Sequence, residues 1–189
     1  TRRATLLLDA RASAHRGSGP SGSFEWSVSA AASIAIHLME QGYALHLLTS
    51  EDERRSDGRA ATDLDRSAAL DVLADIAPSD DEEFTRLLHS AGSTTAPGGL
   101  VICIVGPLDE VDSRTAGALR PPGATGLAIV IDPTPAGVSR GQVPQEHRPA
   151  DRTATILRTA GWAAAVARHG DAVGEVWRRV SGAPARGGR

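Results

Sequence analysis

The feature that most constrains this chain is a short apolar run, residues 5–8, that ends at Asp9. The run is too short for the core of a helix, and a polar loop rich in glycine and serine follows it. A long amphipathic helix is expected to begin near Ser23, a suitable N-cap. In a parallel α/β sheet, ligands bind beside the carboxyl ends of the strands. The sequence therefore predicts a binding surface directly after Asp9.

Other apolar runs have the aliphatic density of buried parallel strands. The predicted strands are residues 5–8, 44–48, 100–105 and 127–131, with a weaker fifth at 162–167. Helical patterns separate them, over residues 23–41, 63–76, 79–89, 108–119, 152–159 and 171–180, and Trp177 is expected to face inward. This alternation predicts an α/β fold, a three-layer sandwich with a mostly parallel, doubly wound, Rossmann-like sheet. We expect one domain over residues 1–182, irregular connections at 51–62, 90–99 and 133–149, and a disordered tail at 183–189.

Composition excludes several classes of function. The net charge is −3 with both signs interspersed, which argues against nucleic acid as a partner. All 20 basic residues are arginine, so no lysine can form a Schiff base or bind phosphate in a P-loop. The histidines are scattered, and the single cysteine, Cys103, lies within a predicted strand, where its thiol would be inert. We therefore expect no enzymatic activity and no cofactor.

Several segments resemble a known family. Residues 6–9, 24–35, 42–49, 157–162 and 177–180 are similar to the domain-of-unknown-function 58 proteins of actinobacteria, which contain a von Willebrand factor A-like domain. The resemblance implies a doubly wound domain that follows two membrane helices and is encoded beside a MoxR-class ATPase. It predicts a membrane-anchored protein at the cytoplasmic face of the membrane, with the ATPase as partner and a membrane segment upstream of Thr1. The chain itself has no apolar run near the ~20 residues of a membrane span.

The loop after Asp9 is similar to the metal-binding Asp-x-Ser-x-Ser loop of von Willebrand factor A domains, but Arg11 replaces the middle hydroxyl. A hard divalent cation needs oxygen ligands, which this site would draw from three loops. The second loop has no threonine at residues 81–83, and the third has an aspartate only at Asp109. The Arg11 guanidinium would also repel a cation. We therefore expect no bound metal. The residual ligand candidates for Mg²⁺ or Mn²⁺ are Asp9 and Ser13.

Basic side chains cluster in the same loop. Arg11, His15 and Arg16 lie just before a Gly-Ser run and the start of the first helix, where backbone amides favour negative charge. The cluster suits an anion or the acidic side chain of a protein partner. In the alternative interpretation, Arg11 pairs with Asp9 and the loop is a flexible connection. The candidate ligand- or partner-binding residues are Asp9, Arg11, Ser13, His15, Arg16 and Asp109.

These observations together predict a non-enzymatic protein–protein interaction domain. Its binding face would be formed by the loops after Asp9, Thr49, Gly106 and Asp132. Two alternatives stay open at this point. One is a metal-dependent ligand-binding module with a degenerate divalent-cation site, and the other is a hydrolase without a recognisable motif.

Overall fold

The computed structural model describes residues 2–50, 65–135, 137–138 and 144–182. Within these ranges the chain forms one five-stranded sheet, with β1 (Arg2–Leu8), β2 (Tyr43–Leu48), β3 (Leu100–Val105), β4 (Thr125–Ile131) and β5 (Ala163–Ala167). The order across the sheet is β2-β1-β3-β4-β5, and every neighbouring pair is parallel. The strands predicted from the apolar runs are confirmed, including the weaker fifth.

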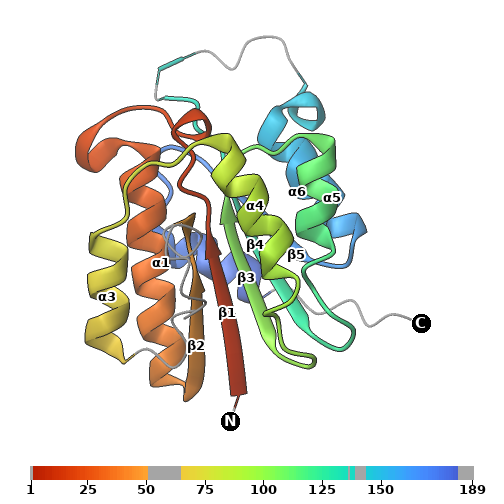
Figure 1. Ribbon diagram of the computed structural model, residues 1–189. Coiled ribbons are helices and arrows are strands. Elements are labelled where there is room, and N and C mark those ends of the chain that lie inside the picture. The colour runs from red at the N-terminus through yellow and green to blue at the C-terminus, as the bar shows by residue number, and fades with distance from the viewer. Residues whose placement is uncertain (1, 51–64, 136, 139–143, 183–189) are drawn as a thin grey trace.

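Helices cover both faces of this sheet (Figure 1). One layer contains α1 (Ser23–Glu40), α3 (Arg66–Ala74) and α7 (Val173–Ser181), and the other contains α4 (Asp81–Ala91), α5 (Glu110–Gly117) and α6 (Pro149–Thr159). Short 3-10 helices, η1 (Ala12–Ala14), η2 (Gly19–Ser21) and η3 (Gln145–His147), lie in the loops. The predicted three-layer sandwich with a doubly wound sheet is confirmed.

Each face of the sheet has its own apolar core, because successive side chains of a strand point to opposite faces. In β1, Leu6 and Leu8 belong to the core under α1, whereas Leu7 belongs to the core under α4. The fully buried side chains of Ala30 and Ala31 are small, which lets α1 lie close to the strands. Strands covered on both faces are apolar along their whole length, and this made them recognisable in the sequence.

The helix boundaries agree with the sequence to within a few residues, with one correction at a cap. Gly22 is the N-cap of α1, whereas Ser23 is its first helical residue and accepts a hydrogen bond from the backbone of the preceding loop. The helix ends as predicted before Gly42, whose φ of 82° suits glycine. Asp80 caps α4 in a capping box with Glu83.

The expectation that Trp177 faces inward holds only in part. In α7, Val176 and Val180 lie four residues apart on the buried stripe, whereas Trp177 is half-buried beside it. The Trp177 ring packs edge-on against His37 of α1, with ring centroids 6.0 Å apart. Its truncation should therefore cost less than that of a core tryptophan.

Two expectations concern segments outside the described residues, the loop at 51–62 and the tail at 183–189; part of the connection at 133–149 also lies outside them. In the part of the chain that is described, no helix combines the length and apolar character needed to traverse a bilayer.

Candidate functional site

The carboxyl ends of β1 and β3 form the switch point of the sheet. The chain leaves β1 towards β2 on one side, and then crosses back to β3 on the other, so the connections diverge here. Open α/β sheets bind ligands in the crevice at such a point. Asp9 directly follows β1, and Gly106 directly follows β3. The backbone N–H of Asp9 donates to the carbonyl of Ile104 at 2.9 Å, which extends the β1–β3 pairing to the edge.

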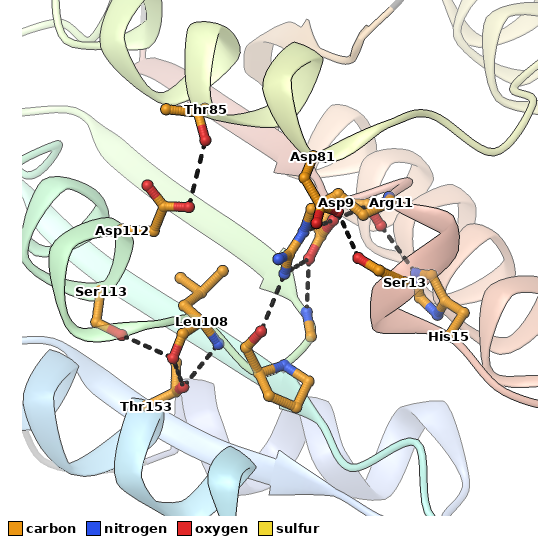
Figure 2. Close-up of polar contacts among 12 residues, drawn as sticks. Asp9, Arg11, Ser13, His15, Asp81, Thr85, Leu108, Asp112, Ser113 and Thr153 are labelled. Carbon is orange, nitrogen blue, oxygen red and sulfur yellow. Dashed lines mark hydrogen bonds and ion pairs between the residues drawn. The ribbon is translucent and has the colours of Figure 1, made fainter.

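Asp9 and Arg11 form a bidentate ion pair at this point (Figure 2). The Arg11 Nε donates to Asp9 Oδ1 at 3.0 Å, and Nη2 donates to Oδ2 at 2.7 Å. The Arg11 backbone N–H adds a bond to Oδ1 at 3.0 Å, and the Gly106 N–H donates to Oδ2 at 2.9 Å. Asp9 is 1% exposed and Arg11 is 8% exposed, so the pair is buried. Both carboxylate oxygens of Asp9 therefore accept two hydrogen bonds from within the chain.

The guanidinium of Arg11 is held on its other sides as well. Its Nη2 donates to the carbonyl of Pro107 at 3.1 Å, and its Cζ lies 4.6 Å from the centroid of the Phe84 ring. Burial opposes the charged form of Arg11, but the hydrogen bonds and charge of Asp9, with Asp81 and Asp112 further away, raise the pKa of Arg11. Arg11 is thus a fixed positive charge inside the site.

Gly106 makes this arrangement sterically possible. A Cβ atom at this position would lie 2.7 Å from the Cβ of Ala14 and 3.1 Å from its carbonyl oxygen. Ala14, in η1, therefore packs directly on Gly106, whose N–H donates to the buried carboxylate of Asp9. The sequence placed the loop after Gly106 on the binding face, but it indicated neither the bond from Gly106 to Asp9 nor the contact of Phe84 with Arg11, because both depend on the strand order.

The residual metal ligands are engaged in other contacts. The carboxylate of Asp9 is occupied by Arg11 and Gly106, and the hydroxyl of Ser13 donates to Asp81 (Figure 2). Asp109 is the N-cap of α5, since its Oδ1 accepts the backbone N–H of Asp112 at 2.7 Å. Across residues 2–50, 65–135, 137–138 and 144–182, no group of three His, Cys, Asp or Glu side chains could hold a metal ion.

The three basic residues predicted to cluster in the first loop are divided between the interior and the surface. Arg11 and His15 are buried, and Arg16 is exposed. The His15 Nε2 lies 3.0 Å from the carbonyl oxygen of Asp9, so it carries a proton and donates to that oxygen, and Nδ1 lies 3.1 Å from the Ser23 hydroxyl oxygen. Ser23 Oγ also accepts from the backbone N–H of Arg16 at 2.9 Å. These contacts tie the loop to α1. The alternative interpretation predicted an Asp9–Arg11 pair in a flexible loop; the pair is present, but the loop is held against the helix.

The surface over the β1–β3 edge is acidic. Asp81 and Glu82 lie in the first turn of α4, and Glu110 and Asp112 lie in the first turn of α5. Partial burial and the charge of Asp109 raise the pKa of Asp112, although Arg11 and a hydrogen bond from Thr85 act against this. The buried guanidinium beneath these carboxylates compensates part of their repulsion. The exposed positive charge of the first loop belongs to Arg16, which does not take part in the Asp9–Arg11 pair.

Comparison with known proteins supports the fold. No family model and no curated protein matches the chain. The structure is similar to a solved structure described as von Willebrand factor type A from Catenulispora acidiphila, with a TM-score of 0.51 and 14% sequence identity. The similarity covers 94% of this chain and 41% of that protein, so the chain spans less than half the length of its neighbour. The chain therefore has a von Willebrand factor A-like fold, as the sequence predicted.

Proposed function

We propose that this chain is a non-enzymatic protein–protein interaction domain that works without a bound metal ion. The observation that carries the proposal is the Arg11 guanidinium, which forms a bidentate pair with Asp9 at the switch point. A fixed positive charge on that carboxylate takes the place of the cation that the Asp-x-Ser-x-Ser loop would bind. The β1–β3 edge is then preformed and needs no exchangeable ion.

Two exposed valines lie at the same edge. Among the described residues the large hydrophobic side chains that are exposed are Val111, at 70%, and Val138, at 55%. Val111 lies in the first turn of α5, and Val138 lies in the loop after β4, so both belong to connections at the carboxyl ends of the strands. A partner on this face would remove both side chains from water, which is favourable.

The single cysteine is a poor candidate for a hydrolase nucleophile, which favours this proposal over a hydrolase. Burial raises the pKa of the Cys103 thiol to about 12, so the reactive thiolate is scarce at neutral pH.

The finer part of the proposal comes from the resemblance to actinobacterial domain-of-unknown-function 58 proteins. On this basis, the chain belongs to a membrane-anchored protein of an actinobacterium and lies at the cytoplasmic face of the membrane. Its partner would be a MoxR-class ATPase, which would contact the carboxyl edge of the sheet.

Site-specific photo-crosslinking in the source cells tests the proposal. A photoreactive amino acid is placed at Val111 or Val138, with exposed Thr125 at the opposite edge of the sheet as the matched control. We expect protein crosslinks from the first two positions and none from the third, with or without a chelator. Crosslinks from Thr125 alone would refute the binding face, and loss of crosslinks in the chelator would refute the metal-free mode. Mass spectrometry of the adducts checks whether the partner is the ATPase.

A further inference from the structure

We infer that a hollow at the carboxyl edge binds an acidic, partly apolar peptide segment of the partner; this inference rests on the proposed function. The hollow is a cavity of about 540 Å³ between the β1–α1, β4–α6 and β5–α7 loops. Its volume lies within the ~300–1,000 Å³ that is usual for ligand pockets. Neither Asp9 nor Arg11 lines it, so it is separate from the buried ion pair.

The inner wall of the cavity is apolar and held in place. Trp26, Ile131 and Ala167 line it, together with Pro133 from the loop after β4. The half-buried indole of Trp26 donates its Nε1–H to the carbonyl oxygen of Asp171 at 2.8 Å, which ties α1 to the β5–α7 loop. A wall whose aromatic ring is already fixed binds an apolar side chain without first losing conformational freedom.

Two basic side chains at the cavity have no acidic partner among the described residues. The Arg16 guanidinium makes one long bond, from Nη1 to the carbonyl oxygen of His15 at 3.4 Å, and His169 is exposed. No carboxylate in the described part of the chain pairs with either of them, whereas Arg168 beside them is paired with Asp151 at 3.0 Å. Arg16 and His169 are therefore available to donate to a carboxylate from outside the chain.

The carboxylates that line the cavity have partners of their own. Asp171 Oδ2 accepts from the Arg179 guanidinium at 2.9 Å and from the backbone N–H of Arg168 at 2.9 Å. Asp132 is 8% exposed, and its Oδ1 accepts the backbone N–H of Thr134 at 3.0 Å and its hydroxyl at 2.6 Å. These bonds hold the two loops in shape. Because they use carboxylate oxygens, which are acceptors, the groups that remain for a ligand are mainly donors.

The apolar surface continues beyond the cavity, which favours a polypeptide over a small free anion. Val138 is exposed, and its backbone N–H lies 3.4 Å from the carbonyl oxygen of Pro135, a residue that lines the cavity. A peptide that places an aspartate or glutamate near Arg16 and His169 would bring its neighbouring side chains onto Trp26 and Val138. The recognised chemistry is thus an acidic residue next to a large apolar one.

Selection of random peptides displayed on phage tests the inference, with the full chain as bait. The expected result is a shared motif in which aspartate or glutamate adjoins leucine, isoleucine or phenylalanine. Synthetic peptides with the motif should bind about tenfold or more weakly to Arg16→Gln, since a charge-assisted hydrogen bond is lost. The matched control is Arg86→Gln, an exposed arginine on α4 that should leave binding unchanged. In NMR spectra the bound peptide should shift the indole N–H signal of Trp26.

Several outcomes would overturn the inference. These are the lack of any enriched motif, a basic motif, equal affinity for Arg16→Gln, or a peptide that shifts the indole signals of Trp162 and Trp177 but not that of Trp26. Acetate that shifts the Trp26 signal as strongly as the peptide would also overturn it, because the cavity would then recognise an anion alone. If the peptide experiments fail but Val111 still forms protein crosslinks, this inference is wrong and the proposed interaction face stands. If a peptide binds but no crosslinks form in cells, the result counts against the proposed function.

Discussion

Replacing Arg11 by alanine should remove a large fraction of the stability of this domain. The side chain of Asp9 has no exposed area, and Arg11 supplies two side-chain hydrogen bonds to it, at 2.7 and 3.0 Å. Without the guanidinium, the buried carboxylate retains only the two backbone N–H bonds from residues 11 and 106. Breaking a buried ion pair from one side costs about 3–5 kcal/mol, because the remaining charge is uncompensated. In a domain of this size the corresponding fall in Tm is roughly 6–20 °C.

Urea unfolding followed by circular dichroism measures this loss, and two variants provide its controls. Arg86→Ala removes an arginine whose pair with Glu82, at 3.7 Å, is exposed, so it should change the unfolding free energy by less than about 0.5 kcal/mol. The double variant Asp9→Asn with Arg11→Met removes both charges, and it should be more stable than Arg11→Ala alone. A loss below about 1 kcal/mol for Arg11→Ala, or a double variant weaker than the single one, would refute the buried-pair reasoning.

The same position tests the relation between the guanidinium and a metal ion. Arg11→Ser restores the middle hydroxyl of the Asp-x-Ser-x-Ser pattern and leaves the Asp9 carboxylate in need of a cation. Magnesium or manganese should therefore raise the Tm of Arg11→Ser and leave that of the wild type and of Arg11→Ala unchanged in differential scanning fluorimetry. A metal-dependent Tm of the wild type would contradict the role assigned to Arg11.

Three further outcomes are expected. Gly106→Ala should lower the unfolding free energy by about 1–3 kcal/mol in urea, because its new Cβ would lie 2.7 Å from that of Ala14; unchanged stability would contradict the close approach. Because the pKa of Asp112 is raised in the folded state, its contribution to stability is greatest at low pH and is lost as the pH rises through that pKa. The Tm of Asp112→Asn should therefore rise relative to that of the wild type between pH 3 and pH 6. A Tm difference that stays constant over this range would count against the raised pKa. Trp162→Ala should lower the unfolding free energy by about 3–5 kcal/mol, since its ring is buried and its Nε1–H donates to the carbonyl oxygen of Gly117 at 2.9 Å. Trp177 is half-buried, so Trp177→Ala should lower it clearly less. The reverse order would be inconsistent with the packing of α7.

Most of the fold was predictable from the sequence, for a definable reason. Strands such as β3, with Val101 to Val105 all buried, lie between two helical layers and need apolar side chains on both faces. Helix ends were marked by residues with local roles, such as Gly42 after α1. The misplaced cap at Ser23 and the half-buried Trp177 show the limit, because α1 and α7 are positioned by contacts between them and with the loops.

The candidate site was predictable only in its location. The sequence placed Asp9 and Arg11 after the first strand, and it left open whether Arg11 faces a partner or pairs with Asp9. That choice depends on Gly106, which lies 97 residues away and reaches Asp9 because β3 is the neighbour of β1. The cavity between the loops after β1, β4 and β5 was not foreseen, since Trp26 and His169 belong to segments far apart in the chain.

The sequence by itself thus determined which segments are strands and helices, because local periodicity and caps are properties of neighbouring residues. The tertiary structure alone decided which charges are buried and which are available. Arg11 and Arg16 differ by five positions and share one loop, yet the first lies against Phe84 and the carboxylate of Asp9, and the second lies beside an open cavity. The desolvation and pairing that separate them arise from residues brought together by strand order, and this order is not contained in any local pattern.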